Sequence, residues 1–203
     1  MRVYGVELIE HEDRVVFNYR RDGEFEPVSM AAWRAAIVKG EAAIDVGSYS
    51  GLYAIAAAKL GASAIAYEPN PNMFSRLRNN VASNNVSVDC RRKAVSDKKE
   101  TRDFYTRHDM TSAGRFTFRK DSQKIEVECE PLSELRKVCA IKIDVEGAEI
   151  FVLRGALGII KRDRPLVIAE ALKDKERDEI TAFMGALGYS YTRADKHNLI
   201  FRP

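Results

Sequence analysis

Residues 42–51 read AAIDVGSYSG, a short apolar strand that runs directly into a turn containing two glycines. Gly47 and Gly51 lack a Cβ atom, so the backbone can turn sharply there and approach a ligand closely. The turn opens an Ala- and Leu-rich helix over residues 52–60. Backbone amides at the start of such a helix favour negative charge in the turn. The stretch therefore predicts the first strand–turn–helix unit of a nucleotide-binding α/β domain.

After this unit, apolar strands alternate with helical segments. We expect strands at residues 62–67, 86–90, 139–145 and 165–170, and helices at 72–83, 150–161 and 176–187. This alternation is typical of a mostly parallel sheet with helices on both faces. A closing hairpin of residues 189–192 and 198–201 should add an antiparallel strand at one edge of the sheet.

Three segments depart from this alternation. Residues 2–10 and 14–19 favour strand and predict a small hairpin, which a helix over residues 27–38 follows. Residues 102–119 and 123–130 alternate weakly and suggest inserted antiparallel strands, with a short helix at 132–138. We therefore divide the chain into an N-terminal hairpin and helix decoration, residues 1–40, and a single compact domain, residues 41–203.

The composition is that of an ordinary globular protein, with 203 residues, 45% hydrophobic, 31% charged and a net charge of +3. We find no apolar run long enough to span a membrane and no apolar core of a signal peptide at the N-terminus. Cys90, Cys129 and Cys139 lie among strand-like residues without a CxxC pair, which favours buried thiols over a zinc site. We expect a cytoplasmic protein.

Acidic residues stand at the ends of the predicted parallel strands. Asp45, Glu68, Asp144 and Glu170 each end or follow such a strand. Ligands of open α/β sheets bind outside the carboxyl ends of the strands. Carboxylates there disfavour a polyphosphate and suit a ligand with hydroxyls and an ammonium group. Glu68 follows the glycine turn by about 20 residues, the spacing at which a carboxylate reaches ribose hydroxyls.

The glycine pattern separates the candidate nucleotides. A dinucleotide turn has the pattern G-x-G-x-x-G, whereas here Asp45 precedes Gly47 and the next glycine is Gly51. An acid at that position would face a pyrophosphate, but it can meet the amino end of S-adenosylmethionine. No Gly-Lys-Ser/Thr follows the turn, which excludes a P-loop. The pattern favours S-adenosylmethionine.

Several motifs together resemble one family. The IDVGSYSG stretch at residues 44–51 and YEPNP at 67–71 look like class I S-adenosylmethionine-dependent methyltransferases. More narrowly, the chain resembles the FkbM family over about residues 42–190. The motifs that carry this resemblance are IKIDVEGAE at 141–149, VLRG at 152–155, RPLVIAE at 164–170, AVSD at 94–97 and LSEL at 132–135.

The resemblance implies a Rossmann-like, seven-stranded, mostly parallel sheet with an antiparallel last strand, and an O-methyltransferase of small molecules or glycans. It implies that the acid and glycines of the turn hold the methionine part, that Glu68 holds the ribose and that residues 94–95 flank the adenine. Tyr49 departs from the family pattern, which usually has Asn there. The predicted cofactor-binding residues are Asp45, Gly47, Ser48, Tyr49, Gly51, Glu68, Pro69, Asn70, Ala94, Val95 and Asp144.

Methyl transfer to a hydroxyl needs a group that takes its proton. Asp144 is the first candidate, Glu146 lies in the turn that follows, and His108 lies in a polar loop between the inserted strands. We assign Glu149 to the acidic first turn of the next helix. Asp144 and Glu170 could converge on a divalent metal, but two carboxylates make a thin site, and we predict none.

Two other functions stay open at this stage. An RNA methyltransferase would use the basic residues between 91 and 99, although no RNA-binding domain is visible in the sequence and the Asn-Pro-Pro-Tyr type of motif is absent. A protein that binds S-adenosylmethionine without catalysis is the other alternative, because Tyr49 enters the glycine turn. The expected partner is a small-molecule or glycan acceptor, with no membrane. An open acceptor pocket also fits a homodimer.

Overall fold

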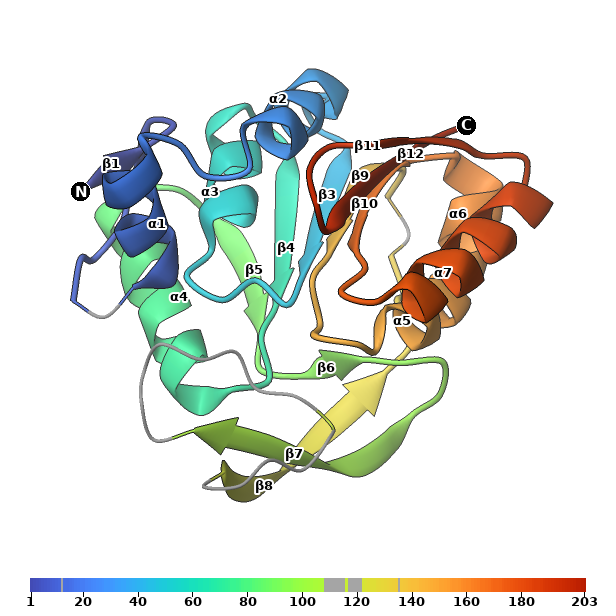
Figure 1. Ribbon diagram of the computed structural model, residues 1–203. Helices are drawn as coiled ribbons and strands as arrows, with labels where there is room; N and C mark the ends of the chain where they lie inside the picture. The colour runs from blue at the N-terminus through green and yellow to red at the C-terminus, as the bar shows by residue number, and fades with distance from the viewer. Residues whose placement is uncertain (12, 108–115, 117–121, 135) are drawn as a thin grey trace.

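The computed structural model describes residues 1–203 except 12, 108–115, 117–121 and 135. It is an α/β fold built on a seven-stranded sheet (Figure 1). The strands of this sheet are β3 (Ala42–Val46), β4 (Ser63–Tyr67), β5 (Val88–Arg91), β9 (Val138–Ile143), β10 (Leu166–Glu170), β11 (Ser190–Arg193) and β12 (Asn198–Arg202). The fold class predicted from the sequence is confirmed.

The strand order across the sheet is β11-β12-β10-β9-β3-β4-β5. Strands β5, β4, β3, β9 and β10 pair in parallel, and β12 is antiparallel to both β10 and β11. The closing hairpin lies at one edge of the sheet, as the sequence predicts. Its last strand, β12, is antiparallel to the main strands and lies between β10 and β11, so that β11 is the outermost strand.

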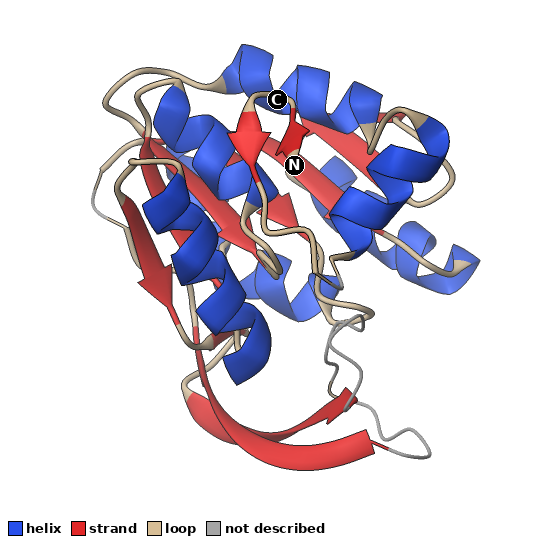
Figure 2. Ribbon diagram, turned by 90° about the vertical axis from the view of Figure 1, so that its left-hand side faces the viewer, coloured by secondary structure: helices blue, strands red, loops and turns tan. Residues whose placement is uncertain are grey.

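Helices cover both faces of this sheet. On one face lie α2 (Pro27–Ala36), α3 (Leu52–Lys59) and α4 (Pro71–Ser83), and on the other lie α5 (Glu149–Gly155), α6 (Leu157–Asp163) and α7 (Asp174–Ala186) (Figures 1 and 2). Side chains of a strand alternate between faces, so Ile44 and Val46 join the core under α5–α7 whereas Ala43 joins the core under α2 and α3. Asp45 shares the face of Ala43.

The N-terminal segment packs onto the α2–α4 side. Strands β1 (Arg2–Val3) and β2 (Val6–Glu7) form a short hairpin. The predicted strand over residues 14–19 is wrong, because this stretch is helix α1 (Arg14–Asp22). Asp13 caps its first turn by accepting hydrogen bonds from the amides of Val15 and Val16, and Gly23 ends it in the left-handed conformation. The apolar residues of α1 therefore follow a helical rather than a strand pattern.

A second, three-stranded sheet lies below the carboxyl ends of the main parallel strands (Figure 1). It consists of β6 (Ala94–Val95), β8 (Ser122–Glu130) and β7 (Glu100–Arg107), with β7 and β8 antiparallel. The helix predicted at 132–138 is wrong: the described residues there form no helix, and β9 begins at Val138. The helix predicted at 150–161 divides at Ala156 into α5 and α6.

No helix among the described residues is long and apolar enough to cross a membrane. The cysteines, all of which lie in the described part of the chain, are free thiols, with Cys129 buried and Cys90 and Cys139 half-buried.

Side chains of helix α4 form hydrogen bonds to both the N-terminal segment and the glycine turn. The buried Asn80 donates a hydrogen bond from Nδ2 to the carbonyl of Ser50 at 2.8 Å and accepts one from the amide of Ile9 at 2.9 Å. One turn further along α4, Asn84 exchanges hydrogen bonds with the backbone of Glu7. Arg76 of α4 pairs with the capping residue Asp13 at 3.4 Å, both side chains being buried.

Replacing Asn80 with alanine should therefore destabilise the protein. The change leaves the buried carbonyl of Ser50 without its partner, which costs about 1–3 kcal/mol. It also removes the part-buried hydrogen bond from the amide of Ile9, worth about 0.5–1.5 kcal/mol. We expect urea denaturation to show a loss of about 2–4 kcal/mol. The neighbouring Asn79→Ala, at an exposed position of the same helix, is the control and should change stability by less than about 0.5 kcal/mol. Equal stability of the two variants would contradict this role of Asn80.

Candidate functional site

A cleft opens at the carboxyl ends of the parallel strands, and the register of the sheet aligns its polar residues. Val46 pairs with Tyr67 on β4 and with Ile143 on β9, and Ile143 pairs with Ala169 on β10. The residues that follow each of these positions therefore stand level along one edge of the sheet, and they are Gly47, Glu68, Asp144 and Glu170. All four line the cleft.

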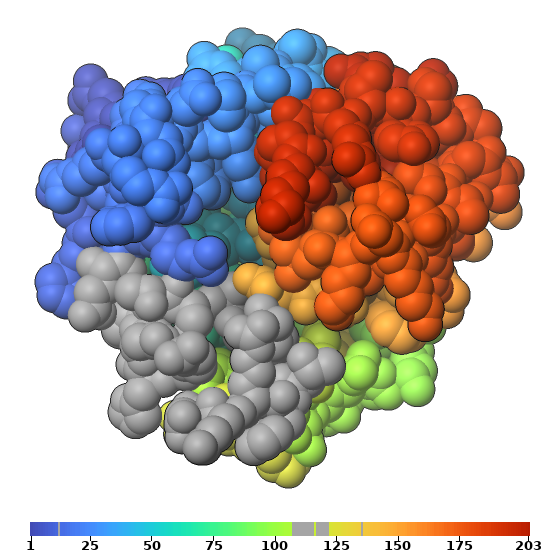
Figure 3. Space-filling view, in the orientation of Figure 1, coloured from blue at the N-terminus to red at the C-terminus, as the bar shows by residue number. Residues whose placement is uncertain are grey.

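The cleft lies between parts of the chain that are distant in sequence. Its walls come from the N-terminal segment, the glycine turn, the second sheet and the loop after β9. Figure 3 shows the surface hollowed between the blue N-terminal part and the orange C-terminal part.

The glycines of the turn are required by protein contacts. A Cβ on Gly47 would lie 1.8 Å from the carbonyl oxygen of Asp144, and one on Gly51 would lie 2.4 Å from Cδ1 of Leu77. Both residues also have positive φ, 79° and 87°. Gly47 lines the cleft, whereas Gly51 caps the start of α3 away from the lining. Because Gly47 and Gly51 have no side chains, the turn can lie directly against the end of β9 and against α4.

Tyr49 lies in the same turn, and its side chain extends away from the turn toward α1. Its φ of 50° is in the left-handed region, which Asn adopts more readily than Tyr. Its amide donates a hydrogen bond to Oε2 of Glu68 at 2.9 Å, and its hydroxyl accepts one from the amide of Arg14 at 3.3 Å. The phenol thus reaches the start of α1 and joins the N-terminal segment to the turn.

Glu68 is held by the backbone on two sides. Oε1 accepts a hydrogen bond from the amide of Asn70 at 2.8 Å, while Oε2 accepts the one from Tyr49. Burial raises the pKa of Glu68 to about 7, although these two hydrogen bonds oppose the shift. Each carboxylate oxygen accepts one N–H, and an ionised carboxylate offers about four lone-pair positions. Glu68 can therefore still accept hydrogen bonds from hydroxyls in the cleft.

Asp45 lies at the floor of the cleft beside α3. Its Oδ2 accepts a hydrogen bond from the amide of Ala54 at 3.1 Å. Burial raises the pKa of Asp45 to about 7, and the nearby ammonium of Lys142 opposes the shift. Ser48 donates its hydroxyl to the backbone carbonyls of Asp45 and Tyr67, which fixes the first residue after Gly47.

Most other predicted cofactor residues also meet at the cleft. Pro69, Ala94 and Val95 line it, the last two from β6 of the second sheet. Asn70 does not line it: this buried side chain caps α4 by accepting hydrogen bonds from the amides of Asn72 and Met73. The local sequence Asn-Pro is an N-cap followed by proline at the first helical position.

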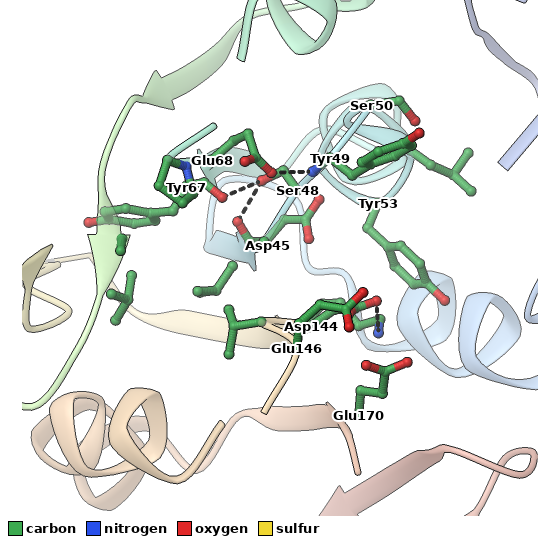
Figure 4. Close-up of a pocket in the computed structure, with 18 of the residues that line it drawn as sticks. Asp45, Ser48, Tyr49, Ser50, Tyr53, Tyr67, Glu68, Asp144, Glu146 and Glu170 are labelled. Atoms are coloured by element: carbon green, nitrogen blue, oxygen red, sulfur yellow. Dashed lines mark hydrogen bonds and ion pairs between the residues drawn. The ribbon is translucent and has the colours of Figure 1, made fainter. Parts of the chain in front are cut away.

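Of the three predicted catalytic residues, Asp144 and Glu146 line the cleft. Figure 4 shows the carboxyl groups of Asp144 and Glu170 directed toward one another. Burial, followed by the charge of Asp144, raises the pKa of Glu170 to about 9, and its buried Oε2 has no hydrogen-bond partner in the structure. His108 lies outside the described residues.

Glu149 holds the loop between β9 and α5. It is buried, and its Oε1 accepts hydrogen bonds from the amides of Val145 and Gly147 at 3.2 and 3.0 Å. Burial raises the pKa of Glu149 to about 7. These contacts give Glu149 a structural part in shaping the turn that carries Glu146. Within the described residues, no group of His, Cys, Asp and Glu side chains is arranged to hold a metal ion.

The sequence analysis missed several lining residues. The N-terminal segment contributes Arg14, Asn18, Phe25 and Glu26, and the second sheet region contributes Lys93, Phe104 and Phe116. Lys142 lies buried in the cleft floor, with only 2% of its surface exposed. A lysine inside the apolar strand at 139–145 predicts a partly exposed or paired residue, and the structure shows a paired residue that is buried.

Three of the five basic residues between 91 and 99 pair with carboxylates. Arg91 binds Asp89 at 2.7 Å, Lys93 binds Glu130 at 2.6 Å, and Lys98 binds Glu100 at 3.0 Å.

Glu170 generates a prediction on pH dependence. Its pKa in the folded protein lies above the ordinary value of 4.5 for a glutamate, so the stability it contributes is present at low pH and is lost as the pH rises toward about 9. The other buried carboxylates, whose pKa values are raised to about 7, still titrate in the lower part of the interval from pH 7 to 9, so the difference between the wild type and Glu170→Gln isolates Glu170. Glu170 should account for a loss of up to about 1.4 kcal/mol per pH unit in the wild type there. Urea denaturation of Glu170→Gln should show a shallower loss.

The exposed Glu128→Gln, on β8, is the matched control and should keep the wild-type slope. A Glu170→Gln protein whose stability falls as steeply as that of the wild type between pH 7 and 9 would contradict the raised pKa.

Comparisons with known proteins agree with this architecture. The sequence profile of the family described as Methyltransferase FkbM domain matches residues 45–191. A search of curated proteins finds no match. The methyltransferase FkbM from Methylobacillus flagellatus KT superposes with a TM-score of 0.58 at 17% identity over 86% of this chain. The chain spans 48% of the length of that protein.

Two further solved structures share the fold. The ribosomal protein L11 methylase from Lactobacillus delbrueckii subsp. bulgaricus has a TM-score of 0.54 at 16% identity, covering 87% of this chain and 76% of its own. The tRNA (uracil-54, C5)-methyltransferase from Pyrococcus abyssi, solved in complex with S-adenosyl-L-homocysteine, has a TM-score of 0.50 at 12% identity, covering 87% of this chain and 37% of its own. The chain belongs to the FkbM methyltransferase family and has the class I, Rossmann-like methyltransferase fold.

Proposed function

We propose that the chain binds S-adenosylmethionine in this cleft and transfers its methyl group to a hydroxyl of a small molecule or glycan. The observation that carries the proposal is Glu68. This buried carboxylate is fixed by the amides of Tyr49 and Asn70, and it keeps lone pairs for hydroxyls in the cleft. The family and the structural relative solved with S-adenosyl-L-homocysteine support the choice of cofactor.

The lining residues fit the chemistry of this cofactor. Glu68 can accept hydrogen bonds from the ribose hydroxyls, and the apolar Ala94 and Val95 can face the adenine ring. Asp45, beside the glycine turn, offers a carboxylate for the ammonium of the methionine part. A pyrophosphate would instead face two buried carboxylates, which argues against NAD.

When bound, S-adenosylmethionine supplies a methyl group activated by a sulfonium. The residues of the chain must then orient the acceptor hydroxyl and take its proton. We assign the proton to the carboxylate of Asp144, which lines the cleft beside the Lys142 ammonium at 3.6 Å. Glu170 holds its own proton near neutral pH because its pKa is raised to about 9. It can therefore donate a hydrogen bond to a neighbouring oxygen while Asp144 accepts one.

The surroundings of these carboxylates favour an uncharged acceptor. Phe25, Phe104 and Phe116 supply aromatic surface on the cleft wall, and Glu26 and Glu146 add negative charge. An acceptor with hydroxyls and apolar faces fits this lining, whereas a phosphate would be repelled.

The test of the cofactor is calorimetric titration of the purified protein with S-adenosylmethionine, S-adenosylhomocysteine and NAD. We expect the first two to bind with Kd on the order of micromolar, the usual range for enzyme substrates, and NAD not to bind. Binding of NAD, or of none of the three, would overturn the proposal. Binding without turnover on any hydroxyl acceptor would indicate a cofactor-binding protein without catalysis.

Separate substitutions of Glu68 and Asp144 should distinguish cofactor binding from catalysis. Glu68→Gln removes the charge that accepts from the ribose and should weaken the affinity for S-adenosylhomocysteine by about tenfold or more. Asp144→Asn should keep that affinity within about threefold but lower turnover by about 100-fold, a typical effect of losing a general base. Unchanged affinity in the first variant would exclude the ribose role, and unchanged turnover in the second would exclude the base.

A further inference from the structure

Lys142 is a buried cation in the floor of the cleft. Its side chain extends from β9, and its Nζ donates a hydrogen bond to Oδ1 of Asn198 on β12 at 3.0 Å. The same Nζ lies 3.6 Å from Oδ2 of Asp144 and 3.8 Å from Oε2 of Glu26. It also lies 5.4 Å from the ring centroid of Tyr53. Burying a charge is costly unless it is paired, so these contacts allow a charged lysine to be buried at this position.

Acidic groups from several elements of the fold face this ammonium. Burial alone would lower the pKa of Lys142, but the surrounding carboxylates outweigh burial and raise it above its ordinary value. The titratable groups that face it are Glu26 at the start of α2, Asp45 on β3, Tyr53 on α3, Asp144 after β9, Glu170 on β10 and Asp195 before β12. Lys142 is therefore charged, and it offsets part of the negative charge of the cleft.

Glu26 has an unusual backbone for its place. It precedes α2 with a φ of 47°, in the left-handed region that disfavours a glutamate, and its side chain does not cap the helix. Instead, Oε2 accepts a hydrogen bond from the hydroxyl of Tyr53 at 2.6 Å and lies 3.8 Å from Nζ of Lys142. Strain of this kind persists where surrounding contacts fix the residue, and it is frequent at functional sites.

Glu26 lies outside the residues matched by the family, which begin at residue 45. It nevertheless lines the same cleft as Asp144 and Lys142, together with Phe25 and Arg14 of the N-terminal segment. Through Glu26, the segment thus meets two groups of the family-defined part of the site, the ammonium of Lys142 and the hydroxyl of Tyr53.

We propose that Lys142 is a positioning residue that holds Glu26 of the N-terminal segment and Asp144 of the sheet edge as a fixed pair of carboxylates beside the reacting methyl group, and that it balances their charge. This inference rests on the proposed function. It makes the N-terminal segment part of the active site, and it makes Lys142 and Glu26 act in opposite directions on a positively charged ligand.

The charge difference between cofactor and product measures this effect. S-adenosylmethionine carries a positive sulfonium, whereas S-adenosylhomocysteine has a neutral thioether in a molecule of nearly the same shape. Removing the Lys142 charge should favour the cationic ligand, and removing the Glu26 charge should disfavour it. If either residue has only a structural role, its substitution should instead lower the affinity for both ligands by the same factor.

The experiment is calorimetric titration of the full chain and its variants with both ligands, expressed as the ratio of the two affinities. Lys142→Met should shift the ratio toward S-adenosylmethionine by roughly threefold to tenfold, and Glu26→Gln should shift it the other way by a similar factor. Lys142→Arg should keep the wild-type ratio. The matched controls are Lys161→Met, on the exposed side of α6, and Glu24→Gln, exposed before α2, and both should leave the ratio unchanged.

The inference would be overturned if Lys142→Met and Glu26→Gln leave the affinity ratio unchanged, including the case in which each lowers the affinity for both ligands equally. The proposed function would stay intact. If Lys142→Met does not fold, the isosteric Glu26→Gln and the charge-conserving Lys142→Arg decide the question. A folded wild type that binds neither ligand would contradict the proposed function itself, and this inference with it.

Discussion

The approach of Gly47 to the carbonyl oxygen of Asp144 is the constraint on which the rest of the site depends. No side chain fits at position 47, because its Cβ would lie 1.8 Å from that oxygen. The turn after β3 can therefore lie directly against the end of β9. From this turn, the amide of Tyr49 reaches Glu68 and the phenol reaches the start of α1. A backbone contact thus sets the positions of the carboxylates on both sides of the cleft.

The site concentrates charge where water is scarce, and this works against stability. Burial raises the pKa of Asp45, Glu68 and Glu149 to about 7, and that of Glu170 further. Each group favours its neutral form, so ionising it costs folding free energy. The ammonium of Lys142 offsets part of this cost from the centre of the group. Clusters of perturbed ionisable groups in a cleft are typical of functional sites rather than of structural cores.

Sequence reasoning succeeded where the signal was local and failed where packing decided. The glycine turn, the parallel strands and the acids at their ends follow from short-range patterns, and the FkbM resemblance is confirmed. The sequence pattern of residues 14–19 predicts a strand, but the cap at Asp13 and the contact of Arg76 with it belong to a helix docked on α4. Asn70 was assigned to the ligand, whereas its side chain caps α4.

The fold class and most of the carboxylates at the sheet edge can be predicted from the chain alone, because periodicity and glycine spacing are properties of neighbouring residues. Which of these groups meet depends on how distant parts of the chain pack together. The strand register brings Gly47, Glu68, Asp144 and Glu170 level, and long-range packing places Glu26 and Asn198 around Lys142. Such contacts join residues separated by many positions, and the burial that makes Lys142 need its partners exists only once the chain has folded.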